Sequence, residues 1–138
     1  MEASADLYLN YLREEGYVPS LNESGDVVFK FQGATFVISV DEQDTQFFRL
    51  IFPNFWAIDT DEELAKALRT ANQVNFMMKV GKILIVENNV WSVVELLLDS
   101  TPELSDVVPR ALHIARQTAE EFGGAMRMSE ITKDLPLN

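Results

Sequence analysis

The sequence contains no cysteine, so the chain has no disulfide framework, no thiolate nucleophile and no zinc–thiolate site. A protein without disulfides fits the reducing cytoplasm, and we expect the chain to act there. Its first residues, MEASADLYLN, lack the basic start and apolar run of a secretory signal. Its longest mainly apolar stretch, KILIVENNVWSVVELLLD, is interrupted by polar and charged residues, so we expect no membrane-spanning helix.

Positive charge is scarce. The chain has 11 Lys and Arg residues against 22 Asp and Glu residues, and its formal net charge is −11. Affinity for nucleic acid comes largely from Lys and Arg side chains that neutralise phosphates, and basic clusters also bind anionic membrane surfaces. The sequence has no such cluster, so we expect neither nucleic acid nor a membrane as a partner.

The residue types of metal and catalytic sites are also few. His113 is the only histidine, and it lies in a helical pattern beside apolar positions. The acidic stretches DEQD (41–44) and DTDEE (59–63) lack the spacing of a calcium loop, and no glycine-rich phosphate loop or nucleophile elbow is present. We therefore expect no metal, no cofactor and no catalytic residue, and we predict that the chain is not an enzyme.

The sequence does contain enough patterned apolar residues for one core. With 47% hydrophobic residues, its length fits a single domain, which we place at 1–124, followed by a C-terminal tail at 125–138. The periodicity predicts, in order, a helix over 4–16, strands over 18–21, 27–32, 35–40 and 47–52, a helix over 61–75, strands over 78–87 and 90–98, and a helix from 105 or 106 that ends at Gly123-Gly124. Because most strand connections are short, this order predicts a two-layer α+β fold, with a mostly antiparallel sheet and the helices on one face.

Short local signals mark the ends and faces of these elements. Thr60 and Glu63 have the spacing of a capping box, and Ser105 or Asp106 is the expected N-cap of the last helix. The asparagine pair at 88–89 suits a tight hairpin because asparagine tolerates positive φ. The expected inward stripe of the middle helix is Leu64, Ala67, Leu68, Ala71 and Val74.

The stretch TANQVNFMMKVGKILIV raises the question of a polar site. Asn75 is expected to be a left-handed cap at the helix end, and Asn72, one turn earlier, can bond the last helix carbonyls or the neighbouring strand. Lys79 and Lys82 have opposite strand parity, so they point to opposite faces unless Gly81 forms a bulge. Two interpretations stay open: a structural corner, which the pattern favours, and a site built on Asn72, Asn75 and Lys79.

Two predicted strands, FFRLIF (47–52) and the one within VWSVVELLL (90–98), carry apolar residues on both faces. The helices account for one face, and the second needs a cover because it would otherwise expose a large apolar patch. A homodimer partner or a bound peptide is the expected cover, and a flanking loop is the alternative. The candidate protein-interaction residues are Phe47, Arg49, Ile51, Trp56, Trp91 and Val93.

The segment YLREEGYVPSLNESGDVVFKFQGATFVISV, followed by ANQVNFMMKVGKILI and a final helix, resembles the bacterial YbjN family of sensory-transduction regulators. These are related in fold to the type III secretion chaperones. The resemblance covers residues 7–122, and its most specific part carries Asn72, Asn75 and Lys79, preceded by the hairpin GDVVFKFQG. It implies a chaperone-like α+β fold that often dimerises and acts through protein–protein contact, and it implies no catalytic residue.

Together these features predict a non-enzymatic, cytoplasmic protein-binding module, chaperone-like or a regulatory adaptor, which acts as a homodimer and binds another protein. Two alternatives remain. One is a small-molecule sensor whose pocket uses Asn72, Asn75 and Lys79 as its polar groups. The other is a purely structural subunit of a larger complex.

Overall fold

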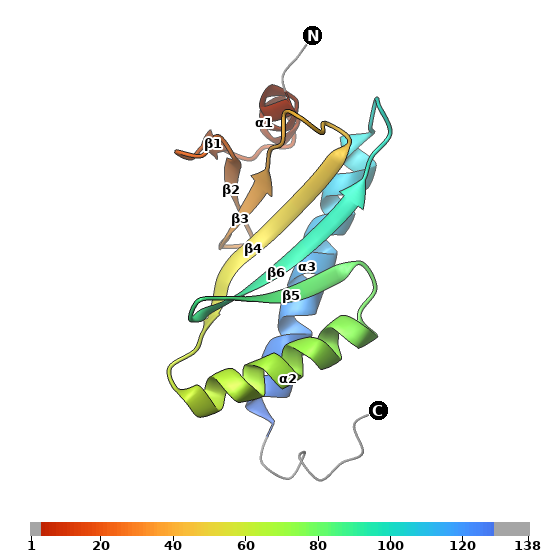
Figure 1. Ribbon diagram of the computed structural model, residues 1–138. Coiled ribbons are helices and arrows are strands. Elements are labelled where there is room, and N and C mark those ends of the chain that lie inside the picture. The colour runs from red at the N-terminus through yellow and green to blue at the C-terminus, as the bar shows by residue number, and fades with distance from the viewer. Residues whose placement is uncertain (1–3, 129–138) are drawn as a thin grey trace.

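The computed structural model describes residues 4–128, which form three helices and six strands (Figure 1). In chain order these are α1 (Ser4–Glu14), β1 (Ser20–Leu21), β2 (Val27–Phe31), β3 (Ala34–Ser39), β4 (Phe47–Ala57), α2 (Asp61–Met77), β5 (Gly81–Val86), β6 (Asn89–Leu97) and α3 (Leu104–Arg127). The predicted element order α-β-β-β-β-α-β-β-α and the α+β class are therefore confirmed. Within the described residues, no helix is long and apolar enough to cross a membrane.

The six strands of the described chain form one antiparallel sheet in the order β1-β2-β3-β4-β6-β5. The chain leaves β4 through α2 and enters β5, and β6 then returns between the two, so β5 lies at the edge of the sheet. β4 continues past its predicted end at residue 52 and includes Pro53. The proline is tolerated there because the register of β4 against β6 shifts between Phe52 and Trp56.

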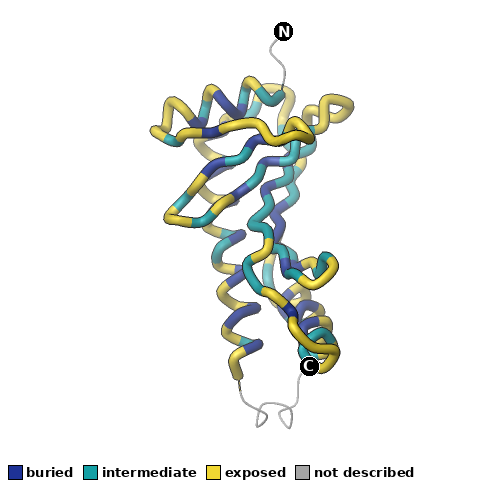
Figure 2. Tube along the Cα trace, turned by 90° about the vertical axis from the view of Figure 1, so that its left-hand side faces the viewer, coloured by how far each residue is buried: buried dark blue, intermediate teal, exposed yellow. Residues whose placement is uncertain are grey.

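The main core lies between the sheet and the helices α1 and α3. Every second residue of the central strands points toward these helices, as the alternation predicts, and α3 runs behind the long strands in Figure 1. Figure 2 shows the same alternation of buried and exposed positions along the tube. We call this side of the sheet the inner face. Its fully buried side chains include Phe36, Ile38, Phe48, Leu50 and Val94, which pack with Leu12 of α1 and Leu112 and Ala115 of α3.

A second core cluster joins α2 to the inner face near the β5 edge. Ala67, Ala71 and Val74 of α2 pack with Ile83 of β5 and Phe122 of α3. Leu68 was expected in this stripe, but its side chain is 53% exposed, so that prediction is wrong. The physical reason is that α2 covers only the edge of the sheet and therefore buries a narrower stripe than a central helix would.

The start of α2 agrees with the prediction, and both ends of α3 differ from it. Thr60 caps α2, and its hydroxyl oxygen accepts a hydrogen bond from the Glu63 N–H at 3.0 Å. The expected cap of the last helix at Ser105 or Asp106 is wrong, because buried Leu104 brings the helix start forward and Glu103 is the N-cap, without a side-chain hydrogen bond. α3 also does not end at the glycine pair 123–124.

α3 continues to Arg127 because Phe122 and Met126, one turn apart, are both buried against the α2 cluster. Residues 125–127 are therefore helical, and the remaining tail prediction, for residues 129–138, lies outside the described residues. In the β5–β6 hairpin the positive φ falls on Glu87 (56°) and not on the asparagine pair 88–89, because Asn89 already belongs to β6.

Candidate functional site

The side of the sheet that faces away from the helices brings most of the candidate interaction residues together. The ladder places Ile51 opposite Val93, Arg49 opposite Glu95, and Phe47 opposite Leu97. On the other side of β6, Trp91 is opposite Leu84 and Val93 is opposite Lys82. We call this surface the outer face: Phe47, Arg49, Ile51, Trp91, Val93, Glu95, Leu97, Lys82 and Leu84.

The outer face is apolar and uncovered. Leu97 is 86% exposed, and Phe47, Ile51 and Trp91 are half-buried. Val93 is only 1% exposed, because it is shielded by its neighbours across the strands. The helices pack against the inner face, so nothing between residues 4 and 128 lies over these side chains (Figure 1).

An ion triad crosses the outer face over three adjacent strands. The Glu95 carboxylate lies between Lys82 and Arg49, with an Arg49 Nη2–Glu95 Oε2 distance of 2.6 Å. Hydrogen bonds from Lys82 and then from Arg49 hold the pKa of the Glu95 carboxyl below its usual range, although partial burial opposes them. The Arg49 guanidinium also lies 5.1 Å from the centre of the Phe47 ring. The Glu95 charge is therefore compensated, and the triad as a whole carries one net positive charge.

This triad predicts a specific pH dependence of stability. Because the folded pKa of Glu95 is lower than its unfolded pKa, its contribution is present above the unfolded pKa and is lost as the pH falls through the folded pKa. At neutral pH, Glu95→Gln is expected to lower the free energy of unfolding by about 0.5–1 kcal/mol, the scale of a partly exposed ion pair. Urea unfolding of the unmodified chain and of the Glu95→Gln variant, at the same protein concentration, checks this. The difference should shrink as the pH falls through the folded pKa of Glu95, and a difference that stays constant with pH would contradict the assignment.

Trp56, the sixth candidate interaction residue, lies on the other side of the sheet. Its ring meets the Phe122 ring edge-on at 6.0 Å, and its indole N–H donates to Glu63 Oε2 at 3.0 Å. The register shift that follows Phe52 turns this end of β4 toward α3. Trp91 remains on the outer face, where its indole N–H donates to Asn54 Oδ1 at 2.9 Å.

The corner between α2 and β5 is built around Asn75. The Ile83 N–H donates to Asn75 Oδ1 at 2.6 Å, and Asn75 Nδ2 donates to the Ile83 carbonyl at 3.2 Å. The side chain thus takes the place of a further strand at the β5 edge. The prediction that Asn75 is a left-handed cap is wrong, because α2 continues to Met77 and its C-cap, Met78, has a φ of −86°.

The other two polar residues of the corner do not converge on Asn75. Asn72 and Lys79 are both exposed, and Lys79 lies in the connection before β5, whereas Lys82 lies on the outer face. None of the three residues Asn72, Asn75 and Lys79 lines either of the two hollows described below. The geometry therefore supports the structural interpretation of this corner.

Backbone packing, which the sequence patterns did not reveal, holds the same corner in place. The Gly81 N–H donates to the Lys79 carbonyl at 2.7 Å, which closes a three-residue turn around Val80 at a φ of 70°. A branched residue is strained at positive φ, so other contacts must maintain the turn. One such contact is that of the Gly81 backbone, which lies directly against Thr118 of α3. Another is the pair of hydrogen bonds between the Asn75 side chain and the Ile83 backbone.

Asn75→Ala is expected to lower the free energy of unfolding by about 1–2 kcal/mol, because it leaves the partly buried Ile83 N–H and carbonyl without their partner. Asn72→Ala is the matched control on the same helix. Both side chains are exposed, but only Asn75 bonds Ile83, so for Asn72→Ala we expect a change within about 0.5 kcal/mol. Urea unfolding of the two variants checks this prediction, and equal effects would contradict the role given to Asn75.

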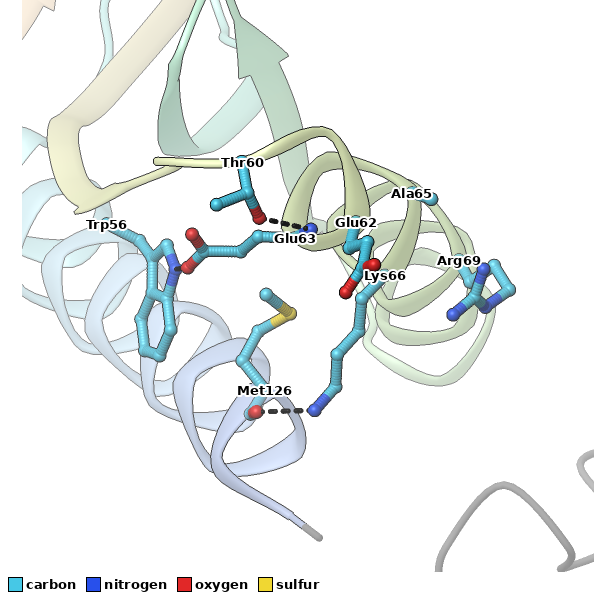
Figure 3. A pocket seen from close by; sticks show the side chains of 8 residues that line it. All are labelled: Trp56, Thr60, Glu62, Glu63, Ala65, Lys66, Arg69 and Met126. Atoms are coloured by element: carbon cyan, nitrogen blue, oxygen red, sulfur yellow. Dashed lines mark hydrogen bonds between the residues drawn. The ribbon is translucent and has the colours of Figure 1, made fainter. Parts of the chain in front are cut away.

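A hollow of about 570 Å³ lies between the start of α2 and the end of α3 (Figure 3). Several of its polar side chains already bond within the protein, although Glu62 and Arg69, which also line it, make no side-chain hydrogen bond or ion pair within residues 4–128. The Lys66 ammonium donates to the Met126 carbonyl at 2.8 Å, and Glu63 accepts from Trp56 and from the Asp59 N–H. The hydrogen bond from Asp59, and then that from Trp56, lower the pKa of the Glu63 carboxyl. These contacts tie the two helix ends together and explain the hollow as a structural junction.

Neither a catalytic nor a metal-binding arrangement of side chains is found within the part of the chain that the structure describes. His113 is exposed on α3, and between residues 4 and 128 no group of three or more His, Asp or Glu side chains is placed to hold a metal ion. No protein-family model matches the chain, and a search of curated proteins gave no match. The outer face is thus the strongest candidate site in the described residues.

Proposed function

We propose that the chain is a non-enzymatic, cytoplasmic protein-binding module, chaperone-like or a regulatory adaptor, that acts as a homodimer joined through the outer face. The observation that carries this proposal is the apolar surface of Phe47, Ile51, Trp91 and Leu97, over which no part of residues 4–128 lies. Contiguous apolar patches with polar groups around them mark protein-interaction sites. The resemblance to the YbjN family, with its type III secretion chaperone-like fold, supports the same function.

A second copy of the chain suits the outer face for an electrostatic reason. Glu95 pairs there with Lys82 and Arg49, so each copy brings one net positive charge to the contact, a small like charge beside the net charge of −11 of each chain. Two sheets can pack in this way with interdigitated side chains, as in a sandwich, and a two-fold axis makes one patch its own partner. The remaining surface is acidic, and it repels the second copy at longer range.

The alternative of a small-molecule sensor finds no comparable support. It would use Asn72, Asn75 and Lys79 in one pocket, but Asn75 is bonded to Ile83 and the other two side chains are exposed elsewhere.

The alternative of a structural subunit differs from the proposal in its partner. In that case the outer face would be covered by a different protein and would stay open in the isolated chain.

Quenching of Trp91 fluorescence tests the proposal in isolated protein. In a Trp56→Phe variant, Trp91 is the only tryptophan, and acrylamide should reach it less in the dimer than in a monomer. Quenching should therefore increase on dilution and when the Leu97→Asp change is added. The control is a Trp91→Phe variant, in which Trp56 should respond to neither. The contrary result is that acrylamide quenches Trp91 equally in the Trp56→Phe variant and in the variant that also carries Leu97→Asp. In that case the outer face is open and the homodimer proposal fails.

A further inference from the structure

Within residues 4–128, a groove on the inner side of the sheet beside α3 is left uncovered. Phe52, Phe55 and Trp56 of β4 form one wall, and Arg116 and Arg127 of α3 form the other. Its volume is about 160 Å³, which leaves room for a side chain between the two elements. We call it the arginine–aromatic groove. It was not expected from the sequence, because the helices were predicted to account for the whole of this face.

The aromatic wall is rigid and already partly desolvated. The Phe52 ring stacks on buried Phe36 with 4.7 Å between ring centres, and it lies 5.4 Å from Phe55. Phe55 and Trp56 both meet the buried Phe122 ring edge-on. Each ring of the wall is therefore anchored in the core on one side and half-exposed on the other. A partner that fills the groove loses little conformational entropy from this wall.

Neither arginine has an acidic partner among the residues that the structure describes. Between residues 4 and 128, both ion pairs belong to Glu95, so neither Arg116 nor Arg127 is paired, although the chain has 22 acidic residues. The Arg127 guanidinium lies 5.5 Å from the centre of the Trp56 ring. A guanidinium at this distance over a ring is attracted by the ring, and its five N–H donors can still serve an acceptor such as a carboxylate.

Gly123 gives Arg127 the space for this position. A Cβ atom at residue 123 would lie 3.3 Å from both terminal nitrogens of Arg127, closer than most such contacts. A glycine in the interior of a helix costs about 1 kcal/mol relative to alanine. A side chain at residue 123 would therefore compete with the Arg127 guanidinium for this space.

We propose that the arginine–aromatic groove docks a segment of another protein that carries an aromatic or apolar side chain next to carboxylates. The apolar side chain enters between the β4 rings and α3, and the carboxylates pair with Arg116 and Arg127. Exposed Glu120 also lines the groove, so the local charge is one positive unit in a protein whose net charge is −11. The positive charge of the groove therefore attracts an acidic segment, whereas the rest of the protein repels it.

The inference extends the proposed function by naming a client chemistry, but it does not depend on the homodimer. The outer face and the groove lie on opposite sides of the sheet, so a dimer joined through the outer face leaves the groove open. Binding to the groove can therefore be measured in the Leu97→Asp variant as well as in the unmodified chain.

Fluorescence anisotropy with short synthetic peptides tests the proposal on the full chain. The probe peptide has one phenylalanine flanked on each side by aspartates, and two comparison peptides replace either the phenylalanine by glycine or the aspartates by lysines. We expect the probe to bind at least about tenfold more tightly than either comparison peptide, the ratio expected from one charge-assisted hydrogen bond or one buried ring. The combined change Arg116→Gln and Arg127→Gln should remove that preference.

Two further variants make the result decisive. Arg110→Gln, at another exposed position on α3, is the matched control and should leave the affinity for the probe unchanged. Gly123→Ala should weaken binding, because the added methyl group displaces Arg127, while circular dichroism shows an intact fold. Absence of probe binding, equal binding of all three peptides, or binding that survives the double arginine change would each overturn the proposal. Loss of binding in the Leu97→Asp variant would instead assign the peptide to the outer face and overturn it too.

Discussion

Gly81→Ala is expected to lower the free energy of unfolding by about 3 kcal/mol, the upper part of the range for adding a methyl group to a packed interior. A Cβ atom at this position would overlap the hydroxyl oxygen of Thr118 and lie 3.1 Å from a methyl carbon of Ile114. Thr118 is fully buried, and its hydroxyl donates to the Ile114 carbonyl at 2.7 Å, so it has little freedom to move away. Urea unfolding monitored by circular dichroism measures the loss.

Gly124→Ala is the matched control for this prediction. Nothing lies within 4 Å of the added methyl group, and the position is inside α3, so the change should stabilise the protein by about 0.5–1 kcal/mol. Adding Thr118→Ala to Gly81→Ala should restore part of the lost stability, because it removes the oxygen that the new methyl group overlaps. A Gly81→Ala protein as stable as the unmodified chain would show that the Gly81 backbone is not in direct contact with the Thr118 side chain.

Leu97→Asp is expected to weaken the proposed homodimer about 100-fold or more, the effect of a strong interface residue. The side chain is 86% exposed in the single chain and lies opposite Phe47 on the outer face, so dimerisation would bury it. An aspartate there would be desolvated in the dimer and would add to the repulsion between two acidic chains. Sedimentation velocity over a concentration series measures the change in dissociation constant.

The control for this prediction is Val18→Asp. Val18 is 90% exposed and precedes β1, at the opposite edge of the sheet from β5 and away from the outer face of β4 and β6. Because both side chains are exposed, neither variant should lose its fold, and the far-ultraviolet circular dichroism spectra should match. Equal weakening by the two substitutions would indicate a general charge effect and would remove the support for an interface at the outer face.

The elements that the sequence predicted well are those whose signals are local. Phe48 and Leu50 alternate with Phe47, Arg49 and Ile51, and this period of two placed the second group together on the outer face. The spacing of the capping box likewise located the start of α2, because the side-chain bond that it encodes spans three residues. Five of the six candidate interaction residues share one face for this reason.

The features that the sequence did not reveal depend on contacts between distant segments. Trp56 departs from the outer face because of a register shift, and Pro53 alone did not show that the strand continues beyond it. The close contact of Gly81 with Thr118 requires α3 to lie behind β5, and no local sequence pattern indicates this arrangement. The arginine–aromatic groove was missed for the same reason, since Arg116 and Trp56 are distant in sequence and meet only through the path of α3.

Sedimentation equilibrium of the unmodified chain tests the central claim, homodimerisation through an apolar sheet face, most directly. The account predicts a mass of twice the chain mass of 15.6 kDa. It also predicts a dimer that tightens as sodium chloride rises, because salt screens the repulsion between two chains of net charge −11 while the apolar contact persists. A mass of 15.6 kDa at every protein and salt concentration would contradict the account.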